Sequence, residues 1–310
     1  MAKRNRVLVT GGAGYIGSSL VPMLLEEKFE VTVIDNFMYG NQYALLPVMG
    51  NRLLTILNED VTRLDWRHFV HFDYIIPLAA IVGAPACDKD KTAAVGTNYA
   101  AIAQMMKCVK KETVVLYPNT NSGYASGLEG YCDEDSPLDP VSLYGKTKVD
   151  GEKSVLSHDN SIVFRLATVF GVSSRMRLDL MVNDFVFRAH HNRDISVFDG
   201  DYRRNFVGVR DVCRAFIHAM FNRYRGVYNL GLDDANMTKR QLAETVSGMV
   251  GGIVTDGKGS DPDKRDYLVS NKKIAKTGFN FKQSLRAGIE DVANFVRTIK
   301  PNDKSRFSNV

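Results

Sequence analysis

The sequence of 310 residues has only four cysteines, nine prolines and one tryptophan, and no hydrophobic run in it approaches 18 residues. The cysteines, at positions 87, 108, 132 and 213, form no CxxC pair and have no histidine at zinc-binding spacing. We therefore expect free thiols of a reducing compartment, with neither a disulfide framework nor a metal site. The absence of a long apolar run argues against a membrane-spanning helix.

The charge balance is also modest. Forty Lys and Arg against 35 Asp and Glu leave a net charge of +5. This surplus is too weak to predict nucleic-acid binding, although it suits a small anionic ligand. The basic start, MAKRNRVLVTGG, has only the short run VLVT before two glycines, which predicts a strand rather than a secretory signal. We expect a cytoplasmic α/β protein with no nucleic-acid or membrane partner.

The first half of the chain alternates short apolar runs with helical patterns. Strands are expected at 6–10, 30–35, 55–57, 74–78, 114–117 and 162–166, and helices at about 15–27, 97–110 and 142–157. Strands that alternate with helices predict parallel β-α-β units with right-handed crossovers. The expected fold class is therefore α/β, with a doubly wound parallel sheet.

The pattern changes after residue 171. A long helix is expected at 175–191, shorter helices at 212–223, 238–250 and 284–298, and short strands at 195–198, 206–209 and 227–230. This pattern predicts a smaller α+β lobe made of 172–206 and 232–300, while 1–171 and about 207–231 form the larger domain. The polar tail, 301–310, is expected to be disordered or to dock on a partner subunit.

A glycine-rich turn follows the first strand and opens the first helix. Gly11, Gly14 and Gly17 would let the backbone approach a diphosphate, and the helix N-terminus offers free N–H groups to the anion. Asp35 ends the next strand, where its carboxylate can accept both hydroxyls of an adenosine ribose and repel a 2′-phosphate. This arrangement predicts NAD rather than NADP. The alternatives are an ordinary tight turn and, for Asp60, either a contact with the adenine amino group or an exposed turn acid.

A tyrosine and a lysine four residues apart follow at Tyr144 and Lys148. On a helix they share one face. For the tyrosine to act as a base near pH 7, its pKa must fall by about three units, or roughly 4 kcal/mol. A lysine ammonium and an oxidised nicotinamide could supply that shift. Thr120, 24 residues before Tyr144, could bond to the substrate oxygen that exchanges the proton. The set points to alcohol oxidation by hydride transfer. The alternatives are a solvated Tyr/Lys pair and a loop whose side chains bond only their own backbone.

These motifs occur together over about residues 5–300. They include GGAGYIG, the Asp35-Asn36 strand end, Leu78-Ala79-Ala80, Asn98, RLATVFG, RRNFVGVRDV and YNLG. The chain resembles extended short-chain dehydrogenases/reductases of the NAD-dependent sugar-nucleotide epimerase/dehydratase family. The resemblance implies a Rossmann domain that binds NAD, a nucleotide-sugar substrate, and a homodimer or larger homo-oligomer formed through helices 97–110 and 142–157.

The resemblance also implies roles for individual residues. Tyr144 would be the base, Lys148 its modulator and ribose ligand, and Thr120 the hydroxyl partner. The implied NAD contacts are Gly11, Gly14, Tyr15, Ile16, Gly17, Asp35, Asn36, Asp60, Val61, Leu78, Ala79, Ala80, Asn98, Tyr144 and Lys148. The implied substrate contacts are Thr120, Asn121, Asn183, Arg204 and Arg265, where guanidinium groups suit phosphate oxygens. Each arginine could instead form a surface salt bridge, and Arg175, Arg177, Arg203 and Arg210 are further candidates.

Two departures from the family pattern narrow the chemistry. Family 4,6-dehydratases have an acidic residue soon after the Ser/Thr, whereas this chain has Asn121 and Ser122, so water elimination lacks its proton donor and acceptor. Epimerase-reductases of the fucose-synthase type have a cysteine beside that residue, and this chain has none there. Cys87 is expected to be a buried thiol. Oxidation at C4 remains, followed either by return of the hydride to the opposite face or by release of a keto sugar.

Several longer stretches carry a finer resemblance. IIPLAAIVGAPAC, YPNTNSGY, RLATVFGVSSRMRLDLMVNDF, DPDKRDYLVSN and the tail RFSNV are similar to bacterial GDP-heptose C4 dehydrogenases of surface-polysaccharide pathways. This resemblance implies GDP-D-glycero-manno-heptose or a relative as substrate. The alternatives are an NDP-hexose 4-epimerase of the UDP-glucose type and a non-catalytic NAD-binding scaffold. Whether a co-substrate such as 2-oxoglutarate reoxidises NADH is open.

Overall fold

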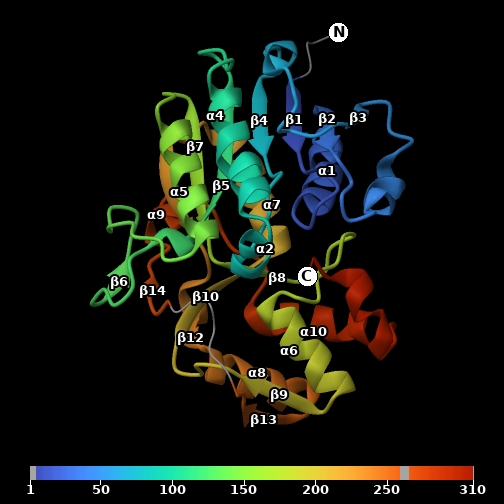
Figure 1. Cartoon of the computed structure of the whole chain (residues 1–310), viewed down its shortest axis with the longest axis vertical. Helices are drawn as coiled ribbons and strands as arrows, with labels where there is room; N and C mark the ends of the chain where they lie inside the picture. The colour runs from blue at the N-terminus through green and yellow to red at the C-terminus, as the bar shows by residue number, and fades with distance from the viewer. Residues whose placement is uncertain (1–4, 259–264, 310) are drawn as a thin grey trace.

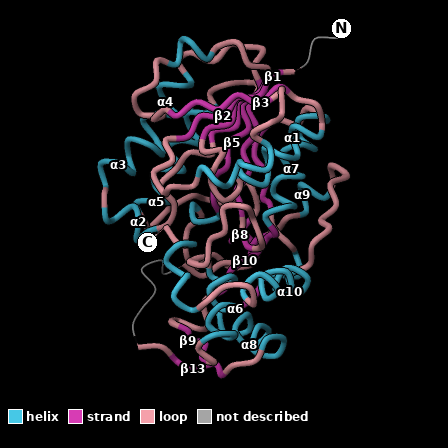
Figure 2. Tube along the Cα trace, turned by 90° about the vertical axis from the view of Figure 1, so that its right-hand side faces the viewer, coloured by secondary structure: helices cyan, strands magenta, loops and turns pink. Residues whose placement is uncertain are grey.

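The computed structural model describes residues 5–258 and 265–309, which form a large lobe and a small lobe (Figures 1 and 2). The large lobe is built on a seven-stranded parallel sheet of order β3-β2-β1-β4-β5-β7-β11. Its strands are β1 (Arg6–Thr10), β2 (Glu30–Asp35), β3 (Leu54–Asn58), β4 (Tyr74–Pro77), β5 (Val114–Thr120), β7 (Ser161–Leu166) and β11 (Gly226–Leu230). The predicted doubly wound α/β fold is confirmed.

Helices bury both faces of this sheet. On one face, α1 (Gly17–Glu26) and α7 (Val209–Asn222) pack on strand residues such as Val7 and Val9. On the other face, α4 (Ala101–Met106) and α5 (Leu143–Leu156) cover Leu8, which lies in a separate core with Ile102 and Val155. Successive strand residues alternate between the two cores, so the strands are apolar throughout, as in other buried parallel sheets. The homodimer expected through α4 and α5 stays a prediction.

The small lobe lies below the sheet in the views of Figures 1 and 2. Its apolar core includes Phe185, Leu242 and Ile289. Its strands are β8 (Thr168–Phe170), β10 (Arg203–Gly208) and β12 (Asn236–Thr238) in one sheet, and β9 (Asp194–Val197) and β13 (Ile253–Asp256) in another. Its helices are α6 (Met181–His191), α8 (Lys239–Val250) and α10 (Leu285–Val296).

Short elements complete the fold. They are α2 (Ala84–Lys89), α3 (Lys91–Val95), α9 (Lys272–Ala275), and the pair β6 (Tyr131–Cys132) and β14 (Leu268–Val269). Short 3-10 helices are η1 (Gln42–Val48), η2 (Trp66–Phe69), η4 (Asn121–Gly123), η5 (Asp233–Ala235) and η6 (Pro301–Phe307), and η3 (Gly96–Ala100) is a π turn. Within the described residues, no helix has the length and apolar character needed to cross a bilayer.

Two expected helices differ from the structure. The helix expected at 175–191 begins only at Met181, because the preceding loop is bonded to the start of α1. In that loop, the Ser173 hydroxyl donates to the Tyr15 carbonyl (2.6 Å), and the Arg175 amide donates to the Ser18 hydroxyl (3.0 Å). The helix expected at 97–110 consists of the π turn η3 and the shorter α4.

The tail is not disordered over its described residues, because η6 docks on its own chain, whereas docking on a partner subunit stays a prediction. Phe307 is an apolar anchor in an otherwise polar segment, with its ring 5.4 Å from that of Phe295. The Leu178 amide donates to the Phe307 carbonyl (2.7 Å), and Lys304 forms an ion pair with Asp184. These contacts bring the following residue pair, 308–309, back to the boundary between the lobes.

Candidate active site

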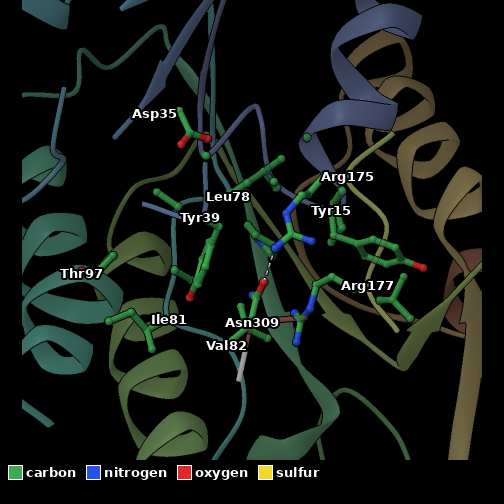
Figure 3. Close-up of a pocket in the computed structure, with 18 of the residues that line it drawn as sticks. Tyr15, Asp35, Tyr39, Leu78, Ile81, Val82, Thr97, Arg175, Arg177 and Asn309 are labelled. Atoms are coloured by element: carbon green, nitrogen blue, oxygen red, sulfur yellow. Dashed lines mark hydrogen bonds between the residues drawn. The ribbon is translucent and has the colours of Figure 1, made fainter. Parts of the chain in front are cut away.

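A cavity of about 330 Å³ opens where the carboxyl ends of β1, β4 and β5 meet (Figure 3). The chain leaves β1 toward β2 on one side of the sheet, and continues from β4 toward β5 on the other. Loops therefore diverge at this point and leave a crevice, which is the usual ligand site of an open α/β sheet. The small lobe closes the crevice through the loop at 171–180.

The glycine turn forms one wall of the cavity, pressed against the end of β4. Gly11 has φ +69°, and a Cβ there would lie only 2.6 Å from the backbone N of Ala79. A Cβ on Gly17 would lie 2.5 Å from the carbonyl oxygen of Gly11. Side chains are thus excluded at both positions, which leaves a backbone cradle of the kind that admits a diphosphate.

The carboxylate of Asp35 lies at one end of the cavity. One of its oxygens accepts from the amide of Ala13 (3.0 Å), and the other accepts from the amide of Phe37 (2.9 Å). Each oxygen keeps lone-pair capacity for a hydroxyl group. Beside it, the Asn36 amide donates to Asp60 (3.1 Å). The acids expected to hold adenosine thus line one end of the cavity together.

Tyr144 and Lys148 reach the cavity from α5. The Lys148 ammonium is buried, 4.2 Å from the centre of the Tyr117 ring. Burial lowers the pKa of Lys148 to about 7, against the opposing effect of the Glu152 charge. Burial likewise raises the pKa of Tyr144 to about 12, although the guanidinium of Arg177 acts in the other direction. Both shifts favour the neutral side chains, so Lys148 carries less than a full positive charge near neutral pH and stabilises the Tyr144 phenolate only in part.

Thr120 ends β5 and lines the same cavity. Its hydroxyl donates to the Ser122 hydroxyl (2.8 Å) and accepts from the Ser122 amide (3.1 Å). These bonds fix the oxygen at the strand end. The expected set of Thr120, Tyr144 and Lys148 is therefore brought together on one wall.

A buried ion pair holds α5 in place. Arg165 on β7 donates to Glu152 on α5 from two nitrogens, at 2.6 Å and 3.3 Å, and Asn119 on β5 also donates to Glu152. Arg165 also donates to the Tyr124 hydroxyl (3.1 Å) and the Glu134 carbonyl (2.9 Å). The network connects the helix with Tyr144 and Lys148 to two strands and to the loop after Thr120.

Some expected residues lie behind the wall of the cavity rather than on it. Asn98 braces the loop after β4, because its side chain accepts from the Ile81 amide (2.8 Å) and donates to the Ile81 carbonyl (2.9 Å). Asn183 is fully buried and does the same for the loop before α6, accepting from the Gly171 amide (3.1 Å) and donating to the Arg177 carbonyl (2.8 Å). Both asparagines position backbone that lines the cavity.

The other expected substrate residues also lie outside the cavity wall. Arg204 and Arg265 are buried in the small lobe, with guanidinium carbons 5.9 Å and 5.8 Å from the centre of the Tyr267 ring. The positive charge of Arg265 nevertheless acts to lower the pKa of Tyr144, against the larger upward effect of burial. Asn121 is buried beside Thr120, and neither polar atom of its side chain has a protein partner among the described residues.

Part of the cavity wall is formed by residues that no sequence motif marks. The missed residues are mainly Tyr39, Ile81, Val82, Leu180 and Asn309, and Arg175 and Arg177 were only unranked candidates. The loop residues follow strands, where a site is expected, but no motif marks them. Asn309 had no positional signal, since only the folded chain brings the tail to the crevice. Cys87, in contrast, is the buried thiol expected, and burial raises its pKa to about 11.

The residues present fit NAD. The backbone cradle at Gly11 and Gly17 leaves space for the diphosphate, and the Asp35 carboxylate suits an adenosine ribose. Tyr144 and Lys148 lie on the same cavity, where a nicotinamide ribose would come within reach. The remaining expected contacts on this wall are Gly14, Tyr15, Ile16, Val61, Leu78 and Ala80.

Replacing Gly11 by Ala should weaken NAD binding by about tenfold or more. The added Cβ would clash with the backbone of Ala79 and shift the turn, and a cost of about 1.4 kcal/mol in binding free energy corresponds to a tenfold loss of affinity. Gly40→Ala is the matched control: Gly40 has φ +60°, but nothing lies within 4 Å of the added Cβ. Each variant loses about 1–2 kcal/mol of stability from its left-handed alanine. Calorimetric titration with NAD, beside thermal unfolding, separates the two effects. Equal NAD affinity in both variants would contradict the cradle.

The Lys148 pKa predicts a pH-dependent stability in the NAD-free protein. Between pH 7 and the ordinary lysine value of about 10.4, the unfolded chain binds a proton that the folded chain does not. Stability relative to Lys148→Met should therefore rise with pH in this window, by up to about 1.4 kcal/mol per pH unit. Urea unfolding at each pH measures the difference. Lys146→Met, at an exposed position two residues away, should show no such slope, and a flat difference for Lys148→Met would disprove the shift.

Known proteins are similar in sequence to this chain over most of its length. UDP-glucuronic acid decarboxylase 1 of Arabidopsis thaliana is 28% identical over 98% of this chain and 73% of its own length. A putative UDP-glucose 4-epimerase of Methanocaldococcus jannaschii is 26% identical over 94% of this chain and 98% of its own length.

Solved structures show the same fold. One is a UDP-glucuronic acid 4-epimerase of Bacillus cereus, solved as a tyrosine-to-phenylalanine mutant in complex with NAD and a fluorinated UDP-glucuronic acid. It matches this chain with a TM-score of 0.85 and 23% identity, over 94% of this chain and 99% of the other. Thermus thermophilus UDP-glucose 4-epimerase in complex with NAD has a TM-score of 0.81 and 24% identity, covering 94% and 99%. Residues 7–231 match the NAD dependent epimerase/dehydratase family, and the chain therefore belongs to this family of NAD-dependent enzymes.

Proposed function

We propose that this protein oxidises a nucleotide-activated sugar at C4, with Tyr144 taking the proton of the C4 hydroxyl. The observation that carries the proposal is the convergence of Thr120, Tyr144 and Lys148 on the cavity that the glycine turn also lines. A non-catalytic scaffold would have no need of this set. The small lobe supplies the buried Arg204 and Arg265 for the nucleotide diphosphate, since guanidinium groups suit phosphate oxygens.

Each residue has a distinct task in this scheme. The Thr120 hydroxyl, held by Ser122, bonds to the C4 oxygen and orients it toward Tyr144. Lys148 gains a proton when an anionic group lies nearby, and its charge then stabilises the phenolate of Tyr144. NAD, when bound, supplies the hydride acceptor. Because a bound anionic ligand increases the positive charge on Lys148, the complex with ligand favours base catalysis by Tyr144 more than the free protein does.

Dehydration is disfavoured by the distribution of carboxylates. Among the described residues, the acids that line the cavity are Asp35, Glu59 and Asp60, all at its adenosine end. Asn121 and Ser122 follow Thr120, where a dehydratase needs an acid. Within the part of the chain that the structure describes, no carboxylate lining the cavity is thus placed to remove a proton from C5 and return it to a leaving hydroxyl.

The relatives named above favour a 4-epimerase as the complete reaction. Their names refer to UDP-sugars, and one is a putative UDP-glucose 4-epimerase over nearly its whole length. We therefore propose reduction of the 4-keto sugar on its opposite face, which regenerates the cofactor without a second substrate. The product would be an isomer of the substrate.

A second candidate is a GDP-heptose 4-dehydrogenase that releases the keto sugar. It is favoured by the segments that resemble such enzymes, because they meet at the cavity. IIPLAAIVGAPAC contributes Ile81 and Val82, YPNTNSGY contributes Thr120, RMRLDLMVNDF contributes Arg177, and RFSNV contributes Asn309. The names of the relatives given above refer to UDP-sugars and not to this substrate. DPDKRDYLVSN lies partly outside the described residues.

Product analysis distinguishes the two candidates. The purified protein is incubated with UDP-glucose, GDP-mannose or GDP-heptose, and the products are analysed by mass spectrometry while absorbance is followed near 340 nm. A new isomer of unchanged mass identifies the epimerase. A product two mass units lighter, or its hydrate, with accumulating reduced nicotinamide identifies the dehydrogenase. No conversion of any nucleotide sugar by NAD-loaded protein would refute oxidation at C4.

Tyr144→Phe should lower turnover by about 10²–10⁴-fold while the protein retains NAD, because only the proton acceptor is lost. The comparison is made at saturating substrate, with NAD content measured on the released nucleotide. Tyr39→Phe, which removes a different hydroxyl from the same cavity, should keep most of the activity. Full activity in Tyr144→Phe would remove the proposed role of this residue.

A further inference from the structure

Arg175 occupies a position that the proposed reaction does not explain. It lies in the loop before α6, its side chain is 3% exposed, and it lines the cavity. Figure 3 shows its guanidinium projecting between Tyr39 and Tyr15, and the guanidinium carbon lies 5.6 Å from the centre of the Tyr39 ring. A cation from the small lobe therefore lines the same cavity as the glycine turn of the large lobe.

The partners of Arg175 are all neutral. Its guanidinium donates to the Met176 carbonyl (2.6 Å), to the Asn309 side-chain oxygen (2.8 Å) and, more weakly, to the Ser308 carbonyl (3.5 Å). In the described parts of the chain, no carboxylate lies within ion-pairing distance of it. Arg177, two residues away, differs because it forms a 2.6 Å ion pair with Asp179.

A buried guanidinium without a counterion is costly, because its charge has lost water and gained no opposite charge. Burial accordingly lowers the pKa of Arg175. Such a group is retained where a ligand brings the missing negative charge. A diphosphate matches it, since two phosphate oxygens can accept from the planar fork of the guanidinium.

We propose that Arg175 binds the diphosphate of NAD, and that Asn309 of the C-terminal segment positions its guanidinium for this contact. The small lobe and the tail thereby take part in holding the cofactor against the glycine turn. The proposal depends on NAD as cofactor and is independent of which sugar is the substrate.

The surroundings of Arg175 favour the cofactor over the substrate as the source of the diphosphate. Its own backbone amide is bonded to Ser18 in the first turn of α1, and the neighbouring Ser173 is bonded to Tyr15. Tyr15 belongs to the glycine turn and Ser18 to the helix start that follows it, where the diphosphate of a dinucleotide is expected. The candidates for the nucleotide sugar, Arg204 and Arg265, lie around Tyr267 instead.

The test measures cofactor retention in the holoenzyme. Release of bound NAD is followed by exchange against excess deuterated NAD, for wild type, Arg175→Gln, Arg175→Lys and Asn309→Ala. Arg175→Gln should release NAD about 10- to 100-fold faster, because it loses hydrogen bonds to a charged group. Arg175→Lys should fall between wild type and Arg175→Gln, and Asn309→Ala should show a smaller increase.

Two controls separate this effect from general loosening. Arg306→Gln removes a positive charge from the same C-terminal segment, at a largely exposed position, and should leave NAD release unchanged. Dissociation constants for UDP and GDP, measured on NAD-loaded protein, should change less than twofold in Arg175→Gln. NAD release from wild type should accelerate with ionic strength, and this dependence should be weaker in Arg175→Gln.

Unchanged NAD release in Arg175→Gln would overturn the proposal. A selective loss of UDP or GDP affinity with normal NAD release would also overturn it, because Arg175 would then serve the diphosphate of the substrate. If Arg175→Gln does not fold, as judged by circular dichroism, the Arg175→Lys and Asn309→Ala variants decide the question by the same readout. Product formation from a nucleotide sugar is scored separately, so failure of the proposed reaction does not affect this result.

Discussion

The buried ion pair between Glu152 and Arg165 is the interaction on which the arrangement of the active site depends. It ties α5 to β7, and the bond from Asn119 adds β5. Breaking such a pair by removing one partner typically costs about 3–5 kcal/mol, because a buried charge remains. Since Glu152 follows Lys148 by one helical turn, the pair that anchors the helix also fixes the height of Lys148 and Tyr144 above the sheet.

The same anchoring explains the electrostatics of the cavity. Lys148 is held in a dry position against the Tyr117 ring, so its charge is disfavoured until an anion arrives. Arg175 is held in a comparable position on the opposite lobe, with neutral partners only. In the free protein, burial makes the charged form of each group costly. Binding of a ligand that carries phosphates therefore recovers part of the free energy spent in building the site.

Much of this fold could be predicted from the sequence, because local signals agreed with each other. The apolar run at β1, the glycines after it and the acid at the end of β2 predict one βαβ unit, and those strand bounds match the structure. The start of α6 and the path of the tail could not be predicted. They depend on bonds between distant segments, such as Ser173 to Tyr15 and Leu178 to Phe307, which no local pattern encodes.

The candidate site divides in the same way. Residues on the strand ends, such as Asp35 and Thr120, reach the cavity because strand geometry alone directs them there. Polar residues in the small lobe were harder to assign, because a buried Asn183 can brace a loop as well as touch a ligand. Arg175 and Asn309 belong to segments 134 residues apart that meet only in the folded chain. In a site formed between two lobes, sequence motifs therefore mark the residues on the sheet side clearly and the residues of the covering lobe weakly. The covering lobe is also where substrate preference can diverge among enzymes that share the same catalytic residues on the sheet side.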